Sequence, residues 1–370
     1  MIYLDHAATT PLRKEAFNVM LPYFAEHAAN ANALYAEGRK ARSAIDQARG
    51  QIADAIHAKS SEIYFTGGGS ESDNWALFGV MRALERKNHI ITTQIEHHAM
   101  LNACAALESL GYDVTYVPVD QWVRVSPQDI EKAIRPETGL VSVMAANNEV
   151  GTIQPIAEIA RIAHAHGVLM HTDAVQAVGH IPIDVAALNV DLLSMAAHKF
   201  YGPKGIGALY IKNGVKITNL VYGGEQERGL RAGTENTPAI VGMGEALALA
   251  CSEMDGAAQQ IVHLRDLLEN EIMQRMPEAI VNGDRKKRLP GTLHVTFPGA
   301  DTNMLLMRLD MEGIAVSAGS ACAAGARERS HVLEAMHVPS GADVRFSLGT
   351  DNDEAQIRQT VDTLYRILNG

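Results

Sequence analysis

The sequence predicts an α/β protein with two parts: a large domain built on a mostly parallel seven-stranded sheet, and a smaller α+β domain. Two observations carry this prediction. Strand-like runs alternate with helical patterns through the first half of the chain, which is typical of a parallel sheet covered by helices on both faces. With 370 residues, the chain is also long enough to bury a large core and to divide into two domains.

The expected strands are short apolar runs separated by polar or glycine-rich turns. They are Glu62–Thr66, His89–Thr93, Asp113–Val119, Gly139–Ala145, Val168–Thr172, Asp191–Met195 and Gly207–Ile211.

A long helical pattern leads out of the large domain. It begins at Thr237 and extends to Met276, with a break expected near Asp255-Gly256 and an end enforced by Pro277. Two or three strands and several helices follow, and the first dozen residues are expected to join them. The domains are therefore expected at residues 15–250 (large) and at residues 1–14 with 251–370 (small).

Lys199 is the most informative single residue. It follows the apolar run Asp191–Ala197, and a glycine-rich turn comes directly after it. A partly desolvated lysine loses its proton more readily than an exposed one, and it can form a Schiff base with an aldehyde cofactor such as pyridoxal phosphate. An isolated lysine is more often a solvated surface charge, so the interpretation depends on other segments.

Asp173 is the candidate partner of a pyridine nitrogen. It ends the strand-like run Val168–Thr172, at the edge where open α/β sheets place their ligands. A carboxylate in contact with the ring nitrogen keeps that nitrogen protonated, so the ring withdraws electrons from a carbanion. The alternative is a helix cap for the following segment.

Residues 67–71 form a candidate phosphate cradle. Three glycines and Ser70 follow a strand-like run and open a helix, so backbone N–H groups can approach an anion closely. The segment fits neither the P-loop nor the dinucleotide-binding pattern. A flexible turn is the alternative.

Together these segments resemble the cysteine desulfurases of the class V aminotransferase superfamily, which are fold type I pyridoxal-phosphate enzymes. The resemblance covers nearly the whole chain. Its further motifs are Tyr3–Thr10, Glu96-His97, Asn147–Gly151, Gln176, His198-Lys199, Gly223-Gly224, Arg231–Thr234, Ser317–Cys322, Ser330–Leu333 and Arg345–Gly349.

The resemblance implies a role for each matching residue. It implies that Lys199 carries the cofactor, that Asp173 holds the ring nitrogen, and that His97 stacks on the ring and helps to move protons. It also implies that Asn148 and Gln176 contact the phenolic oxygen, and that Gly69, Ser70 and His198 contact the phosphate. Thr234 is implied to contact the phosphate of the neighbouring subunit, and Arg345 to bind the substrate carboxylate. No metal ligands are assigned.

Cys322 distinguishes among the chemistries of such enzymes. It lies in Ser317–Ala326, a run of small residues that cannot anchor itself in a core, so a loop is expected. A thiolate there can attack the substrate's sulfur and carry it away as a persulfide. A lone cysteine is otherwise a small buried hydrophobe, which is the interpretation for Cys104 and Cys251.

Two segments depart from the family's pattern. Ala196 replaces a serine that usually touches the phosphate, and the loss of one such hydrogen bond costs about 1 to 2 kcal/mol. Asn30–Tyr35 lacks the serines and the histidine usual there, which puts one wall of the site and the substrate preference in doubt.

Overall composition predicts a cytoplasmic protein. The net charge of −11 argues against nucleic-acid binding as the main activity, and no run of 18 apolar residues suggests a membrane span. Three cysteines do not form a disulfide framework. The basic run Arg285–Arg288 is interpreted as a solvated turn, with docking of an acidic sulfur acceptor as the alternative.

The expected function is that of a homodimeric cysteine desulfurase, which converts L-cysteine to L-alanine and leaves a persulfide on Cys322. An iron–sulfur scaffold, a tRNA-thiolating enzyme and a small carrier protein all remain open as the sulfur-acceptor protein. One alternative is a selenocysteine or cystine lyase of the same fold. Another, of a different class, is an inactive partner-binding subunit.

Overall fold

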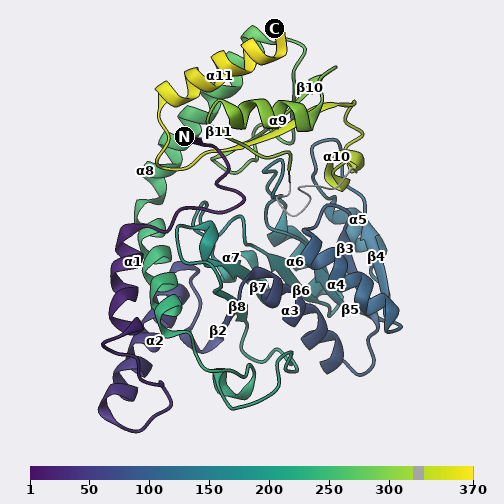
Figure 1. The fold of residues 1–370 in the computed structure, drawn as a ribbon. Helices are drawn as coiled ribbons and strands as arrows, with labels where there is room; N and C mark the ends of the chain where they lie inside the picture. Colours follow the sequence, from purple (N-terminus) through teal and green to yellow (C-terminus); the bar gives the residue numbers. More distant parts are fainter. Residues whose placement is uncertain (320–328, 370) are drawn as a thin grey trace.

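The computed structural model describes residues 1–319 and 329–369. The chain forms two bodies, each with its own sheet (Figure 1). The larger contains a seven-stranded sheet in the order β2-β8-β7-β6-β5-β3-β4. Its strands are β2 (Ile63–Thr66), β3 (His89–Thr93), β4 (Asp113–Val117), β5 (Thr138–Ser142), β6 (Leu169–Asp173), β7 (Leu192–Ala196) and β8 (Gly207–Ile211).

The sheet is mostly parallel, as predicted. Only β8 pairs antiparallel with its neighbours, β2 and β7, and the other four pairs are parallel. Each predicted strand is present with small differences at its ends. The central strands β5, β6 and β7 are almost completely buried, which explains their continuous apolar runs, because helices cover a parallel sheet on both faces.

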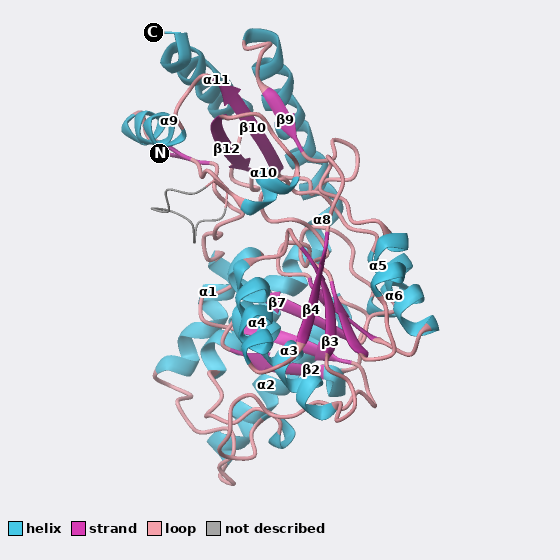
Figure 2. Ribbon diagram, turned by 90° about the vertical axis from the view of Figure 1, so that its right-hand side faces the viewer, coloured by secondary structure: helices cyan, strands magenta, loops and turns pink. Residues whose placement is uncertain are grey.

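Side chains alternate between the two faces of this sheet and meet a different set of helices on each. Ile90, Leu140 and Leu192 pack with α3 (Gly69–Ala83) and α4 (His98–Ser109) on one face. Their sequence neighbours pack on the opposite face, as expected from the two-residue period of a strand. The helices there include α2 (Ala36–Ala55), α5 (Pro127–Ala133), α6 (Ile156–Ala165) and α7 (Val185–Leu188). Figure 2 shows α3 and α4 on one side of the strands and α5 and α6 on the other.

The helix α8 (Thr237–Arg275) joins the two bodies (Figure 1). Its first half packs on the large core through residues such as Met243 and Leu247, and its second half packs on the small core through Leu264 and Leu268. The predicted break near Asp255-Gly256 was wrong, because the helix is continuous across it. A helical glycine costs only about 1 kcal/mol relative to alanine, and the apolar contacts of both halves outweigh that cost.

The smaller body contains an antiparallel sheet in the order β12-β10-β9, and the N-terminal strand β1 pairs with β11. Ile2 and Leu4 belong to its core, so the first residues join this body. Its strands are β1 (Ile2–Tyr3), β9 (Ile280–Asn282), β10 (Thr292–Pro298), β11 (Ile314–Ala315) and β12 (Gly341–Ser347), and its helices are α9 (Thr302–Met311), α10 (His331–Ala335) and α11 (Glu354–Asn369).

The remaining short elements connect these layers. They are α1 (Lys14–Met20) and the 3-10 turns η1 (Leu21–Phe24), η2 (Ser60–Glu62), η3 (Ala197–Lys199) and η4 (Glu227–Gly229). Within residues 1–319 and 329–369, no helix combines the length and the apolar character needed to cross a membrane.

Candidate active site

A cavity of about 220 Å³ lies where the carboxyl ends of the central strands meet the N-termini of α3 and α4. Nine residues predicted from the sequence line it together. They are Gly69, Ser70, His97, Asn148, Asp173, Gln176, His198, Lys199 and Arg345. Eight of them come from the large body, while Arg345 lies on β12 of the small one.

Two predicted residues are not placed in this cavity. Thr234 is exposed on the loop before α8 and does not line it. The neighbouring Glu235 accepts hydrogen bonds from Asn32 and Arg42 at 3.1 and 2.7 Å. The segment Asn30–Tyr35 therefore lies beside this loop and does not form a wall of the cavity in one chain. Cys322 lies outside the described residues.

Lys199 lies in η3, directly after the central strand β7. Its Nζ donates hydrogen bonds to the carbonyls of Ala7 and Ala8, at 2.5 and 2.9 Å. Gln176 Nε2 donates to the same Ala7 carbonyl at 3.0 Å. The N-terminal segment thus forms one wall of the cavity, and sequence reasoning missed this role because backbone carbonyls carry no side-chain signal.

Asp173 ends β6, the strand next to β7. Burial raises the pKa of its carboxyl to about 6, although Val175 N–H donates to Oδ1 at 2.9 Å and the Lys199 charge opposes the rise. Asp73 on α3 also lines the cavity, and burial together with the Asp173 charge raises its pKa strongly. Two buried carboxylates this close do not both ionise readily, so we assign the proton to Asp73 and the charge to Asp173. Asp73 looked like an ordinary helix residue in the sequence.

His97 caps α4, since its Nδ1 accepts a hydrogen bond from Ala99 N–H at 3.1 Å. This bond assigns the ring proton to Nε2. Burial, reinforced by the positive charge of Lys199, lowers the pKa of His97 to about 4. The imidazole is therefore neutral near neutral pH, and it can give or take a proton at Nε2. His98 is the first residue of the helix.

The glycine-rich segment bends sharply before α3. Gly68 has a φ of +150°, and a Cβ on Gly69 would lie 2.8 Å from Cγ2 of Val175. Both positions therefore need glycine. Ser70 and His198 line both the main cavity and an adjoining cavity of about 460 Å³. Lys204 also lines the adjoining cavity, and its position could not be foreseen from spacing alone.

Arg345 is almost completely buried, at 1% exposure, and so is not the surface charge that its residue type suggests. Its guanidinium donates to Asp5 Oδ1 at 2.7 Å and to the carbonyl of Asn148 at 2.8 Å. Its Nε is buried and has no hydrogen-bond partner among the described residues. A buried donor without a partner is costly, and a bound carboxylate can satisfy it.

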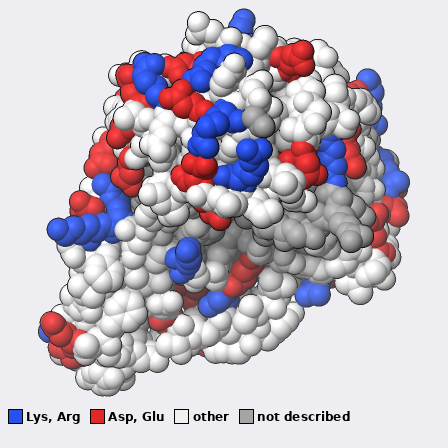
Figure 3. All heavy atoms as spheres, turned by 45° about the horizontal axis from the view of Figure 1, so that its top comes forward, with Lys and Arg blue, Asp and Glu red and all other residues white. Residues whose placement is uncertain are grey.

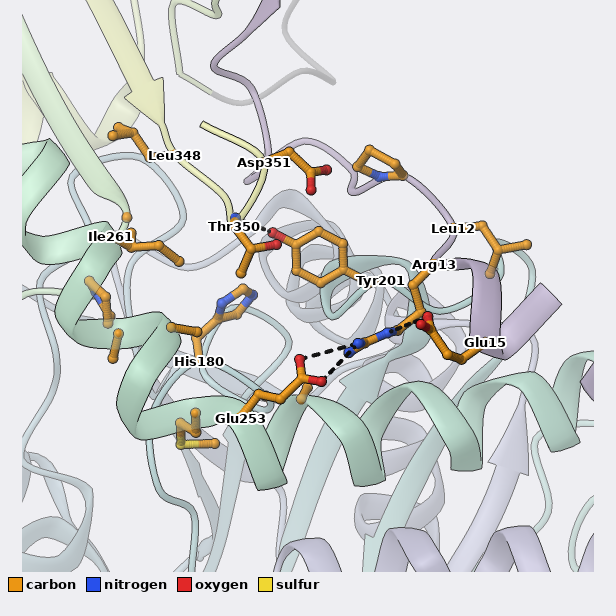
Figure 4. Close-up of a pocket in the computed structure, with 18 of the residues that line it drawn as sticks. Leu12, Arg13, Glu15, His180, Tyr201, Glu253, Ile261, Leu348, Thr350 and Asp351 are labelled. Atoms are coloured by element: carbon orange, nitrogen blue, oxygen red, sulfur yellow. Dashed lines mark hydrogen bonds and ion pairs between the residues drawn. The ribbon is translucent and has the colours of Figure 1, made fainter. Parts of the chain in front are cut away.

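A larger cavity, of about 370 Å³, lies behind Lys199 between α1, α8 and the loop after β12 (Figure 4). Its polar side chains mostly pair with one another or with nearby backbone. Arg13 bridges Glu15 and Glu253, Tyr201 accepts a hydrogen bond from Thr350 N–H, and His180 bonds to the Lys199 carbonyl at 2.7 Å. These groups support the back of the site and do not converge on a ligand.

The run Arg285–Arg288 is only partly solvated. Arg288 is buried and forms an ion pair with Glu269 of α8 at 2.7 Å, and Arg285 pairs with the same carboxylate. Lys286 and Lys287 cap the turn through their N–H groups, which donate to Asp284. Within the described part of the chain, no group of three or more His, Cys, Asp or Glu residues is arranged to hold a metal ion.

A lysine behind a central strand, a buried carboxylate one strand away and a glycine-rich helix start define a site of the pyridoxal-phosphate type. Residues 2–360 match the model of the class V aminotransferases. The cysteine desulfurase IscS of Dictyoglomus turgidum is 49% identical, over 99% of this chain and 94% of that protein. The chain therefore belongs to the cysteine desulfurases of the class V aminotransferase family.

Solved structures agree with this assignment. A NifS-like protein superposes with a TM-score of 0.94 at 39% identity, covering 100% of this chain and 99% of the other. A structure described as SspA in complex with cysteine superposes with a TM-score of 0.84 at 39% identity, covering 95% and 99%.

Enzymes of this family use pyridoxal 5'-phosphate, and the residues present fit that group. A buried, ionised Asp173 suits a protonated ring nitrogen, and the start of α3 at Gly69 and Ser70 lines the cavity, where helix N-terminal N–H groups suit an anion. Ala196 adds no hydroxyl to that cradle, so the N-terminus of α3, Ser70 and His198 remain for the phosphate.

Proposed function

We propose that this enzyme converts L-cysteine to L-alanine and leaves the sulfur as a persulfide on Cys322. The observation that carries the proposal is the convergence on one cavity of Lys199 from the turn after β7, Asp173 from the end of β6 and Arg345 from β12. The names of the similar proteins support cysteine as the substrate.

The cofactor's contacts follow from the cavity walls. We assign its attachment to Lys199, its ring nitrogen to Asp173 and its phosphate to the start of α3. We further assign His97 to the face of the ring. Asn148 and Gln176 are assigned to the phenolic oxygen, and Ser70 and His198 to the phosphate. When bound, pyridoxal phosphate supplies an electron-withdrawing ring that weakens the bonds at the substrate's Cα.

The protein's own groups orient the substrate and move protons. The unpartnered Nε of Arg345 binds the substrate carboxylate. Lys199 Nζ moves the proton at the substrate's Cα, and neutral His97 exchanges a proton at Nε2.

Sulfur transfer balances without an added oxidant or reductant. The Cys322 thiolate attacks the substrate's sulfur, so an S–S bond forms while the C–S bond breaks. The substrate's carbon keeps the electron pair and takes up a proton to become the methyl group of alanine. The two electrons that the substrate's carbon gains come from the two thiol sulfurs, which are oxidised together to the persulfide level as the S–S bond forms.

We propose a homodimer in which Thr234 reaches the neighbouring subunit's phosphate. Thr234 is exposed and does not line this chain's own cavity, which supports that role. Large apolar side chains are exposed nearby, among them Leu34, Tyr35 and Tyr222, and exposed apolar patches are typical of interfaces. Charged side chains crowd the upper half of the face in Figure 3, and its lower half is mostly uncharged.

We further propose a cytoplasmic enzyme that passes its persulfide to an acceptor protein, namely a scaffold, a tRNA-thiolating enzyme or a small carrier. The proposed domains are residues 15–250, and residues 1–14 with 251–370. A selenocysteine or cystine lyase is not favoured, because the full-length relatives are named cysteine desulfurases. An inactive subunit is not favoured either, because Lys199, Asp173, His97 and Arg345 are present and line one cavity.

Replacement of Cys322 tests the proposal. Cys322→Ser is expected to bind the cofactor and cysteine but to lose alanine formation, because a serine hydroxyl stays protonated and is a poor nucleophile toward sulfur. Mass spectrometry of the wild type after reaction with cysteine is expected to show one added sulfur on the Cys322 peptide. Cys104 and Cys251 serve as internal controls, since burial raises the pKa of both thiols. A Cys322→Ser enzyme that forms alanine at the wild-type rate would sink the proposal.

A further inference from the structure

Glu149 is a buried carboxylate beside the cavity that the chemistry described above does not use. It is 1% exposed, and it lies in the turn after β5, between Asn148 and Val150. Asn147 shapes this turn, because its Oδ1 accepts hydrogen bonds from the N–H groups of Glu149 and Val150 at 2.9 and 3.0 Å. These bonds fix the backbone from which the Glu149 side chain extends.

Two segments far apart from Glu149 in sequence meet at this carboxylate. The hydroxyl of Ser330 donates to Oε2 at 2.5 Å. The backbone of Gly319 approaches from another side, and a Cβ there would lie 2.7 Å from the same oxygen. Gly319 and Ser330 flank the residues that contain Cys322, so one carboxylate is hydrogen-bonded to one end of the cysteine-bearing segment and lies close against the backbone of the other.

Each end also has an anchor of its own. Ser317 exchanges backbone hydrogen bonds with Arg345 on β12, at 2.6 and 3.3 Å. Arg329 forms an ion pair with Asp343 on the same strand at 3.1 Å. Ser330 caps α10 by accepting from Val332 N–H at 3.1 Å. These anchors fix the ends to β12 and α10, and Glu149 links them to the cavity wall.

The link to the substrate site is short. The residue before Glu149 is Asn148, whose carbonyl accepts a hydrogen bond from the Arg345 guanidinium. Among the residues that the structure describes, Glu149 forms no ion pair, so a salt bridge does not explain its burial. A buried carboxylate without such a partner is costly, and its hydrogen bond to Ser330 offsets part of that cost.

We propose that Glu149 is a positioning residue that holds the two ends of the Cys322 segment together at the rim of the cavity. Holding both ends limits the volume that the thiol can visit, and so raises its effective concentration at the substrate's sulfur. This inference rests on the proposed persulfide chemistry of Cys322. It assigns Glu149 to sulfur transfer and not to cofactor or substrate binding.

Glu149→Gln tests the proposal in the complete enzyme, because it keeps the size of the side chain and removes the charge. Hydrogen–deuterium exchange is expected to speed up at both 317–319 and 330–333. Because a hydrogen bond to a charged acceptor is stronger than one to a neutral acceptor, the single-turnover rate of persulfide formation on Cys322 is expected to fall about 10-fold or more. Exchange of the Cα proton of L-alanine with deuterated water needs no thiol, and it should keep its wild-type rate.

Two further variants sharpen the test. Ser330→Ala removes one end of the contact, and its effect should not add to that of Glu149→Gln in the double variant. Glu334→Gln changes an exposed glutamate of α10, the helix that Ser330 caps, and this variant should behave as the wild type.

Three outcomes would overturn the proposal: unchanged hydrogen exchange at either end, unchanged persulfide formation, or an equal loss of persulfide formation and alanine exchange. The last would assign Glu149 a general structural role. An active Cys322→Ser enzyme would instead disprove the persulfide role of Cys322. The hydrogen-exchange result would still show whether Glu149 holds both ends of the segment.

Discussion

The Nζ of Lys199 donates a hydrogen bond to the carbonyl of Ala8 at 2.9 Å, although 191 positions separate the two residues in the sequence. The N-terminal segment pairs with the small body through β1 and Leu4, and it then crosses to the end of β7. The lysine is thus held at the junction of the two bodies. The cavity depends on that junction, because Arg345 enters it from the small body.

Lys199→Ala is expected to lose the cofactor's yellow absorbance after gel filtration, because no other amine replaces its bond to the cofactor. Borohydride reduction of the wild type, followed by peptide mapping, should place the cofactor on Lys199. Lys204 lines the adjoining cavity and is the alternative lysine to which the cofactor could attach. Trapping on Lys204 would show that the assignment is wrong.

Arg345→Lys is expected to raise KM for cysteine about 10-fold to 100-fold, because a lysine cannot reproduce the buried fork that spans Asp5, Asn148 and the substrate carboxylate. Steady-state kinetics of alanine release give KM and kcat separately. The cofactor's absorbance serves as the control, and it should match that of the wild type. An unchanged KM would contradict the assignment of the substrate carboxylate to Arg345.

Mixed dimers test the role of Thr234. Lys199→Ala homodimers should be inactive, and Thr234→Ala homodimers should bind the cofactor weakly. If each site takes Lys199 from one subunit and Thr234 from the other, a mixed dimer contains one intact site and one doubly defective site. Tagged mixed dimers should therefore recover up to about half of the wild-type activity and cofactor content. Dilution should release cofactor and activity together. No recovery in the mixed dimer, or a fully active monomer in sedimentation, would place Thr234 outside the site.

Glu96 is expected to make stability depend on pH. Burial raises the pKa of its carboxyl from 4.5 to about 8, and its Oε2 has no hydrogen-bond partner among the described residues. Between these pH values the folded protein keeps a proton that the unfolded chain has lost. Its contribution is therefore fully present below pH 4.5 and is lost as the pH rises through about 8.

Glu96→Gln removes this titration. The free energy of unfolding of the wild type should fall relative to the variant by up to about 1.4 kcal/mol per pH unit across that window. Urea unfolding of both proteins between pH 5 and pH 8 measures the difference. Parallel pH profiles would show that the buried Glu96 is ionised.

Local sequence signals located the large body and most of the candidate site. Lys199 and Asp173 follow buried apolar runs, and the carboxyl ends of neighbouring parallel strands meet at one edge, so their proximity could be inferred from order and period alone. The glycines before α3 were equally clear, because positive φ values and close backbone approaches restrict a position to glycine. Arg345 and Thr234 came only from the resemblance to a family, since nothing in their own segments indicates their partners.

The tertiary structure decided the rest. It continued α8 through Asp255-Gly256, because apolar contacts in both bodies exceed the local cost of one glycine. It buried Arg345 and brought the Ala7 and Ala8 carbonyls to Lys199. It also joined Gly319 and Ser330 at Glu149. Each of these contacts links segments separated by more than a hundred residues, apart from the α8 continuation. Periodicity and spacing describe neighbours along the chain, whereas burial and pairing at such a distance depend on how the two bodies pack.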